Sequence, residues 1–207
     1  MKDILSALEF LTLSVGFQDF NFYIWGQTQM NSKVLPPINI KAWIAENRDS
    51  LKPPVGNKQL FSNTGDFIVM AVGGPNARKD FHVNQGEEIF YQLEGDIVLE
   101  LMEFPENAQP VRRAQIVKEG ELFLLPAGVP HGPRRPAGTV GLVIERHRKP
   151  GELDGFHWYC ENCQRLLHEG HIPVSDIEGQ LKELLTQFFE DKNKCTCQHC
   201  GTVMQKP

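Results

Sequence analysis

Cysteine is missing from most of this chain: all five cysteines of the 207 residues lie between residues 160 and 200. An odd number of cysteines in one short stretch does not suit a disulfide framework, which would also be unusual in a reducing compartment. Long apolar runs are missing too, because the longest window, residues 4–15, is interrupted by Ser, Glu and Thr and is too short to span a bilayer. That window also lacks the basic flank and the cleavage site of a signal peptide. We therefore expect a cytoplasmic protein without a membrane partner.

An excess of positive charge is absent as well. With 21 Lys and Arg against 26 Asp and Glu, the formal net charge is −5, and no basic stripe is visible. Nucleic acid and anionic membranes are therefore poor candidates for partners. The chain is 41% hydrophobic, which suits one globular domain with a core of ordinary size and a small appendage.

Short apolar runs separated by Gly, Pro and Asn fill residues 60–150. Six of them have the length of a strand: DFIVMAV, EIFYQL, DIVLELMEF, AQIV, ELFLL and GLVIE. Turn signals at this spacing are typical of an all-β barrel or sandwich. In the third run, Ile97, Leu99 and Leu101 share one face. The opposite face mixes apolar residues with a glutamate, so the periodicity supports this fold class without deciding it.

By composition the chain divides into an N-terminal extension (residues 1–30), a strand-rich barrel (31–150) and a C-terminal segment (151–207). Between two Pro-Pro stretches, KAWIAENRDSL predicts a short helix. In the C-terminal segment, SDIEGQLKELLTQFFED carries a stripe of apolar residues at helical spacing. Ser175 and Glu178 form a capping-box pattern at its start. This segment therefore predicts an amphipathic helix.

A histidine and a glutamate stand close together in HVNQGEEIFYQLEG, residues 82–95. NQG is a turn signal, so the stretch predicts a hairpin with His82 at the end of one strand and Glu88 near the start of the next. Both side chains can then point into one interior, with Phe90 and Gln92 on the face of the glutamate. Taken alone, such a pair is more typical of a solvated surface than of a metal site.

A second stretch, GELFLLPAGVPH at residues 120–131, has the pattern of a strand, a rigid Pro-Gly corner and a histidine at the start of the following strand. Together the two stretches match both motifs of the cupin superfamily. The first has His, Glu six residues later and Gly seven beyond; the second has Gly, then Pro at six, Gly at eight and His at eleven. The chain resembles cupins, which implies an all-β fold: a jelly-roll barrel (double-stranded β-helix) that holds a metal in its interior.

The cupin resemblance implies a ligand set of His82, Glu88 and His131. Many cupins carry a second histidine two residues after the first, where this chain has Asn84, so two histidines and one carboxylate remain. Such a set is the facial triad of non-haem Fe(II) oxygenases, which leaves positions open for substrate and dioxygen. Glu87 is a rival for the carboxylate, but the cupin spacing favours Glu88.

The residues around both motifs resemble the bacterial 3-hydroxyanthranilate 3,4-dioxygenase family. The resemblance covers residues 36–201 and rests on PPINIKAWIAENRDSLKPPVGNKQ, VGGPNARKDFHVNQGEEIFYQLEGD, ELFLLPAGVPHGPRRP, GLVIERHRKPGELDGFHWYCENC and TCQHCG. It implies a cytoplasmic homodimer with Fe(II) that opens the ring of 3-hydroxyanthranilate with O2, giving 2-amino-3-carboxymuconate 6-semialdehyde on the route from tryptophan to quinolinate and NAD. Gly132 stands where the family often has Ser, a small change in a loop.

The resemblance also assigns roles to polar residues. Arg135 is implied to bind the substrate carboxylate, for which a guanidinium offers a flat bidentate fork. Its neighbour Arg134 is expected to point to solvent. Glu145, at the end of GLVIE, and the ligand Glu88 are implied to contact the amine or hydroxyl of the substrate. Arg78 is implied to lie by the oxygen position, where a cation would favour developing negative charge.

Two C-x-x-C pairs, Cys160 with Cys163 and Cys197 with Cys200, flank the predicted C-terminal helix. Two such pairs complete a tetrahedral sulfur shell around one metal. Four protein ligands leave no open position, so this site should be structural or outer-sphere rather than catalytic. The resemblance implies a rubredoxin-like iron centre, although zinc would satisfy the same ligands. Cys195 is left over as an unpaired thiol.

Other parts of the chain carry weaker signals. Four histidines, at 147, 157, 168 and 171, have no metal spacing and are interpreted as surface or loop residues. Residues 1–29 carry no motif, so we expect upstream sequence joined by a wrong start codon; the alternative is a genuine extension that packs on the barrel or on a dimer partner. Two other functions stay open: a cupin enzyme of another class, such as an isomerase, or a non-catalytic metal sensor or electron-transfer module built around the cysteines.

Overall fold

The computed structural model describes residues 34–207 except 54–55, 63–64 and 175–176, and the side chains of 177–179. The chain divides into two compact units, Met1–Ile38 and Asn39–Pro207. The described part of the first unit, residues 34–38, has no helix or strand. The expectation about residues 1–29 and the Ser175–Glu178 capping box lie outside the described residues.

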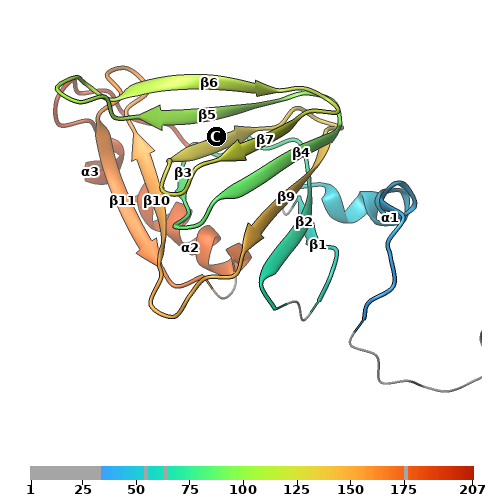
Figure 1. The fold of residues 1–207 in the computed structure, drawn as a ribbon. Coiled ribbons are helices and arrows are strands. Elements are labelled where there is room, and N and C mark those ends of the chain that lie inside the picture. The colour runs from blue at the N-terminus through green and yellow to red at the C-terminus, as the bar shows by residue number, and fades with distance from the viewer. Residues whose placement is uncertain (1–33, 54–55, 63–64, 175–176) are drawn as a thin grey trace, which may run out of the picture. The chain divides into compact units, whose positions relative to one another are not determined.

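Two antiparallel sheets form the second unit (Figure 1). The first sheet has the order β1 (Asn57–Gln59), β2 (Phe67–Gly73), β9 (Val140–Arg146), β4 (Glu88–Glu94) and β7 (Leu122–Leu125). The second has the order β11 (Leu166–Ile172), β10 (Asp154–Tyr159), β3 (Phe81–Val83), β8 (His131–Arg134), β5 (Ile97–Glu103) and β6 (Val111–Val117). All six predicted strands are present. The predicted all-β jelly-roll barrel, followed by a small helical segment, is confirmed.

The inward faces of both sheets supply the main core. On β5, Ile97, Leu99 and Leu101 are all buried and pack with Phe90 of β4 in the opposite sheet, as the sequence predicted. Met102 points to the other face of β5, where it is also buried. Because strand side chains alternate between faces, the residues of β4 that follow Glu88 at even spacing also point into this interior.

The predicted hairpin between His82 and Glu88 is wrong. β3 pairs with β8 and β10 in the second sheet, whereas β4 pairs with β7 and β9 in the first. The backbone carbonyl of Asn84 accepts from the N–H of Gly128 at 2.8 Å, and its side chain accepts from the N–H of Gly86 at 2.9 Å. These local bonds shape NQG into a crossing from one sheet to the other, rather than a ladder turn.

A short helix lies where KAWIAENRDSL predicted one. It comprises α1 (Ile40–Asn47) and a 3-10 turn, η1 (Arg48–Leu51). The side chain of Asn39 accepts from the N–H of Ala42 at 3.1 Å and so caps the first turn. A small apolar cluster fixes both pieces on the first sheet; its buried members are Ile44, Leu51, Ala71 and Val140.

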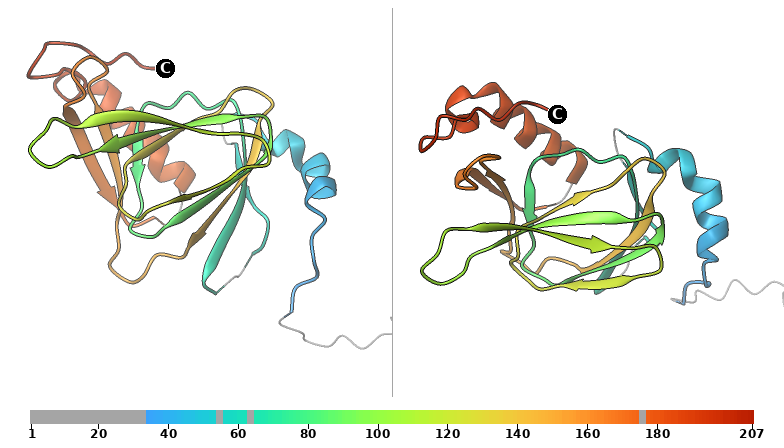
Figure 2. Two further views of the ribbon diagram at one scale, coloured as in Figure 1. Left: turned by 45° about the horizontal axis from the view of Figure 1, so that its top comes forward. Right: turned by 90° about the horizontal axis from the view of Figure 1, so that it is seen from above.

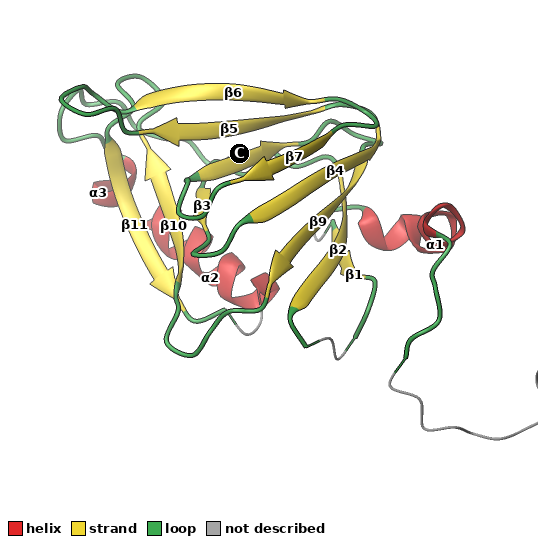
Figure 3. Cartoon of the chain, viewed as in Figure 1, coloured by secondary structure: helices red, strands yellow, loops and turns green. Residues whose placement is uncertain are grey.

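The C-terminal segment contains the predicted helix, α2 (Ile177–Glu190), a short α3 (Lys192–Cys195) and the unpredicted strands β10 and β11, which extend the second sheet. The helices lie against β10 and β11 (Figure 2) and outside the strands of the barrel (Figure 3). Phe188 of α2 stacks on Trp158 of β10 with ring centroids 4.4 Å apart. Among the described residues, no helix has the length and apolar character needed to cross a membrane.

Candidate active site

Three side chains from three strands converge inside the barrel. His82 of β3 and His131 of β8 are direct partners across the second sheet, and Glu88 of β4 faces them from the first. Nδ1 of His82 lies 3.4 Å from Oε1 of Glu88, and Nε2 of His131 lies 3.4 Å from Oε2 of the same carboxylate. The crossing between sheets explains this arrangement, because it sets the glutamate opposite the histidines.

The geometry of these three residues fits a metal ion. Donor atoms about 2.1 Å from a metal are separated by about 3.0 Å at a right angle and about 3.4 Å at a tetrahedral angle. One donor atom from each residue lies within 4.8 Å of the others. Oε1 of Glu88 is buried and has no hydrogen-bond partner among the described residues. A buried carboxylate oxygen without a partner is costly, and a cation between the three groups would remove that cost.

The other ring nitrogens are held by the surrounding protein. Nε2 of His82 lies 2.6 Å from Oδ2 of Asp154, and Nδ1 of His131 lies 3.1 Å from the carbonyl of Val129. A proton on each of these nitrogens leaves a lone pair on the nitrogen that faces Glu88. The buried Asp154 also accepts from Nε of Arg148 at 2.8 Å. The sequence analysis did not identify Asp154 or Arg148 as residues of this site.

Electrostatics keep the central carboxylate ionised. Burial alone would raise the pKa of Glu88, but the neighbouring His131 and His82 lower it to about 2. Its partner across the β4–β9 ladder is Glu145. Burial, and then the charge of Glu88, raise the pKa of Glu145. The pKa values of the two adjacent carboxyl groups are thus shifted in opposite directions. This suits Glu88 for holding a negative charge and Glu145 for exchanging a proton.

Glu145 is held by one hydrogen bond and one ion pair. Nδ2 of Asn84 lies 2.6 Å from Oε2 of Glu145, and Nη1 of Arg148 lies 2.7 Å from Oε1. Asn84 occupies the position where many cupins have a second histidine, and here its amide orients a carboxylate instead. Arg148 contacts both Glu145 and Asp154, so one guanidinium connects the carboxylate beside His82 to the carboxylate beside Glu88.

Arg135 is a buried cation without an anionic partner. Arg135 is 3% exposed, and no carboxylate of the described residues lies within ion-pair distance of its guanidinium. Nη1 donates to Oε1 of Gln92 at 3.3 Å, and Nε has no partner within the described chain. Burial lowers the pKa of Arg135 to about 10, so the group remains charged at neutral pH. Gly141 makes room for it, because a Cβ there would lie 3.2 Å from Nη1.

Arg134 and Arg78 lie differently. Arg134 does not extend into solvent as expected: Nη2 donates to Oε2 of Glu100 at 2.7 Å, and the half-buried side chain lies over the ring of Phe81. The alternation of strand faces separates it from Arg135. Arg78 pairs with both oxygens of the buried Asp80, with Nε at 3.0 Å from Oδ1. Nε and Nη2 of Arg78 are therefore already engaged by a carboxylate.

Comparison with known proteins gives a match over the same region. The family model described as 3-hydroxyanthranilic acid dioxygenase matches residues 32–189. The chain belongs to the 3-hydroxyanthranilic acid dioxygenase family.

Relatives of this dioxygenase family member come from several bacteria. The chain is 45% identical over 174 residues to the 3-hydroxyanthranilate 3,4-dioxygenase of Xanthomonas euvesicatoria pv. vesicatoria (strain 85-10), covering 84% of this chain and 95% of that protein. It is 44% identical over 173 residues to the 3-hydroxyanthranilate 3,4-dioxygenase of Bacillus cereus (strain 03BB102), covering 84% and 94%. Among solved structures, a cupin-2 domain containing protein from Shewanella frigidimarina is 17% identical, with a TM-score of 0.37 over 50% of this chain and 92% of that one.

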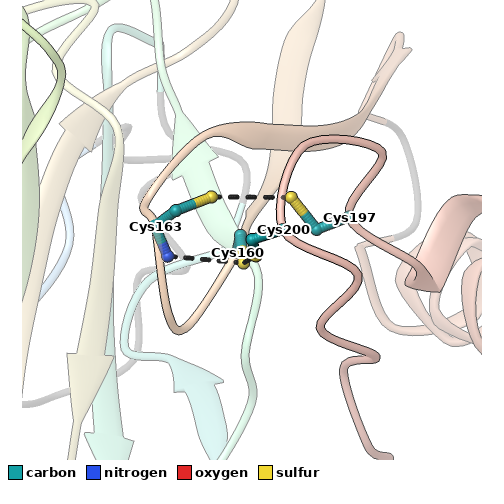
Figure 4. Close-up of side chains that lie close together, drawn as sticks. All are labelled: Cys160, Cys163, Cys197 and Cys200. Atoms are coloured by element: carbon teal, nitrogen blue, oxygen red, sulfur yellow. Dashed lines mark hydrogen bonds between the residues drawn. The ribbon is translucent and has the colours of Figure 1, made fainter.

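The four predicted cysteines of this family member also converge (Figure 4). Sγ of Cys160 lies 3.5 Å from Sγ of Cys200, and Sγ of Cys163 lies 3.5 Å from Sγ of Cys197. A tetrahedral shell with metal–sulfur bonds of about 2.3 Å has edges of about 3.8 Å, close to these separations. The cysteines are free thiols, and Cys195 lies apart, donating its S–H to the carbonyl of Phe188.

The two cysteine turns have the same backbone design. In each, the N–H of the first cysteine bonds the carbonyl five residues later, and its carbonyl accepts from the N–H four residues later. The residue in that fourth place has positive φ in both turns: Gln164 at 62° and Gly201 at 73°. Hydrogen bonds from the side chain and backbone of Thr202 lower the pKa of Cys200 to about 5. A thiolate is therefore favoured at Cys200. At Cys163 a backbone hydrogen bond that lowers the pKa is outweighed by burial and the neighbouring cysteines, which raise the pKa to about 12.

The interpretation of the remaining histidines as surface or loop residues holds for the exposed His147 and His171 and is wrong for the half-buried His157 and His168. His157, His168 and His171 lie on β10 and β11 and not in loops. His168 stacks on Trp158, with centroids 5.7 Å apart, and is half-buried. His157 and His171 converge with Glu169. The strands were missed because their polar residues hide the alternation that sequence reasoning relies on.

Proposed function

We propose that this chain is an Fe(II)-dependent dioxygenase that opens the ring of 3-hydroxyanthranilate with O2 to give 2-amino-3-carboxymuconate 6-semialdehyde. The observation that carries the proposal is Arg135, a buried cation whose Nε has no partner among the described residues and whose Nη1 contacts Gln92, a residue on the same face of β4 as Glu88. A buried charge without a partner is costly, so an anionic ligand is the natural occupant. Family membership names that ligand class as an aromatic carboxylate.

The inner faces of β4 and β9 arrange the groups in an order that suits such a substrate. Glu88 pairs with Glu145 at one end, and Gln92 pairs with Gly141, beside Arg135, at the other. Between them lies the pair Phe90 and Val143. Polar groups for the amine and hydroxyl thus lie at one end, an apolar surface for the ring in the middle and a guanidinium for the carboxylate beyond.

Each residue has a role that follows from its charge. His82, Glu88 and His131 would hold iron(II), which supplies open positions for the substrate's hydroxyl and amine and for O2 and passes electron density from the ring to oxygen. Arg135 would grip the carboxylate with two parallel N–H bonds. Glu145, with its raised pKa and its carboxylate held by Asn84 and Arg148, would accept a proton from the substrate hydroxyl.

Arg78 is proposed to lie on the oxygen side of the site. Support for this role comes from the family resemblance. The buried Asp80 would hold the guanidinium in one orientation through its two-point contact. A fixed cation stabilises developing negative charge without reorganisation.

The cysteines are proposed to bind a second metal, iron or zinc, with a structural role. Their support is the sulfur–sulfur spacing and the paired turns described above. The metal would join the turn after β10 to the turn after α3, closing the C-terminal segment on itself. A cytoplasmic homodimer completes the proposal, in keeping with the family.

Anaerobic reconstitution with Fe(II), followed by 3-hydroxyanthranilate and then air, tests the function. We expect one O2 consumed per substrate, with the near-ultraviolet absorbance of the semialdehyde appearing at the same rate. A cupin isomerase would leave O2 unconsumed, and a sensor or electron-transfer module would leave the substrate intact. Iron bound in the barrel without ring cleavage would refute the proposal.

A further inference from the structure

A third group of candidate metal ligands lies on β10 and β11, outside both sites described above. His157 of β10 is the direct cross-strand partner of Glu169, and Gly155 is the partner of His171. The three side chains therefore share one face of the sheet, with His171 diagonal to His157. Each offers one donor atom, and these atoms lie within 4.8 Å of one another.

His157 is oriented for a ligand that the protein itself does not provide. Its Nδ1 lies 3.0 Å from the hydroxyl of Tyr159, which fixes the ring. Its Nε2 is buried and has no hydrogen-bond partner among the described residues. The nearest carboxylate oxygen, on Glu169, is 3.7 Å away, beyond hydrogen-bond range. Held on one side and unpaired on the other, the ring has the arrangement of a metal-ligating histidine.

The absence of a side chain at position 155 keeps this face open. A Cβ on Gly155 would lie 3.1 Å from Nε2 of His157 and 3.5 Å from Cδ2 of His171. Any larger residue would occupy the space between the two rings. The ring centroids are 5.7 Å apart with an interplanar angle of 71°, so the rings do not stack on each other.

This group is separate from the barrel site because it occupies the opposite face of β10. The neighbours of His157 on the strand, Phe156 and Trp158, point the other way: Phe156 stacks on His82 and Trp158 packs on Phe188 of α2. Glu169 and His171 are exposed on β11, which is the edge strand of the second sheet. An ion can reach the group from solvent without passing through the barrel.

We propose that His157, Glu169 and His171 form a third metal site, which takes a divalent transition ion such as Zn2+. Two imidazoles and one carboxylate suit Zn2+, Cu2+ or Ni2+ and do not suit Mg2+ or Ca2+, which prefer oxygen ligands. Water would complete the coordination on the exposed side. Because the ligands come from both strands, a bound ion ties the edge strand β11 to β10.

The test uses the full chain with its barrel and cysteine sites already loaded and its metal content measured. Titration with Zn2+ by calorimetry should show one further equivalent, and Co2+ should produce visible absorption bands. Removing only a hydrogen-bond partner of a metal ligand lowers the affinity for the metal by about 10- to 100-fold. His171→Ala and Glu169→Gln each remove a ligand itself, so each should weaken Zn2+ binding at least about tenfold. His147→Ala, an exposed histidine elsewhere, is the matched control and should bind like the parent.

Two further measurements make the result decisive. Zn2+ should slow amide exchange in β11 of the parent and leave it unchanged in His171→Ala. The further equivalent should also persist in His82→Ala, which excludes displacement of the barrel metal. His157→Ala should abolish binding, and the exposed positions 169 and 171 carry the test if that variant fails to fold. No further equivalent in the parent, or equal affinity in the parent and in both exposed variants, overturns the proposal.

Discussion

Asp154 accepts a hydrogen bond from Nε2 of His82 at 2.6 Å, although 72 positions separate the two residues in the chain. The same carboxylate is bound by Arg148, which also contacts Glu145. Burial opposes ionisation of Asp154, but Arg148 and His82 lower its pKa to about 2. The negatively charged Asp154 therefore accepts a hydrogen bond from the proton-bearing side of the His82 ring, which makes the other ring nitrogen, Nδ1, a better metal ligand.

Asp154→Asn should therefore weaken metal binding in the barrel by about 10- to 100-fold, as the loss of such a partner does in other metal sites. The amide keeps the shape of the side chain but removes the charge that orients and polarises His82. Competition of the loaded enzyme with a chelator measures the affinity. Asp66→Asn, at an exposed position, is the control. Equal affinities in both variants would show that Asp154 has only a packing role.

His82→Ala or His131→Ala should abolish ring cleavage and barrel metal while leaving metal bound at the cysteines. Each variant removes one of the three proposed ligands, whereas the sulfur site draws on a different part of the chain. Metal analysis together with activity distinguishes the two sites. Full barrel occupancy in either variant would show that the ligand assignment is wrong.

Arg135→Ala should raise KM strongly, because a buried substrate carboxylate would lose its charged partner at a cost of about 2–5 kcal/mol. Arg135→Lys should recover only part of the loss, since an ammonium cannot form the bidentate fork. Arg134→Ala is the matched control: its guanidinium is paired with Glu100, away from Arg135, and KM should stay near the parent value. An unchanged KM in Arg135→Ala would move carboxylate binding to another residue.

Cys197→Ser should lose the sulfur-bound metal and destabilise the C-terminal segment, yet keep ring cleavage per barrel iron. A site with four protein ligands has no position for substrate or O2. Cys195→Ser is the control, because the serine hydroxyl can still donate to the carbonyl of Phe188, and the metal should be retained. Zero activity in Cys197→Ser with barrel iron present would bring electron transfer from the cysteines into the mechanism.

Local patterns in the sequence were enough for much of the fold. Strand-length apolar runs between turn residues predicted six strands of the barrel, because burial on one face leaves a mark in the order of residues. The amphipathic stripe predicted α2 for the same reason. β10 and β11 left no such mark, because their polar residues form their own contacts on the outer face. The two strands pair with each other, and β10 also pairs with β3, which lies in a distant part of the chain.

Within the candidate sites, the sequence by itself determined which residues come together. The cupin motif spacing singled out His82, Glu88 and His131, and the two C-x-x-C pairs singled out the four cysteines, and the structure brings each group together. Only the tertiary structure decided how they meet, because the chain crosses between sheets at Asn84 where a hairpin was expected. The tertiary structure also decided which residues form hydrogen bonds with the candidate ligands. Asp154 reaches His82 because β10 pairs with β3, which is distant in the chain. His157 meets Glu169 and His171 because the consecutive strands β10 and β11 pair in one particular register. Neither pairing could be predicted from the local sequence pattern.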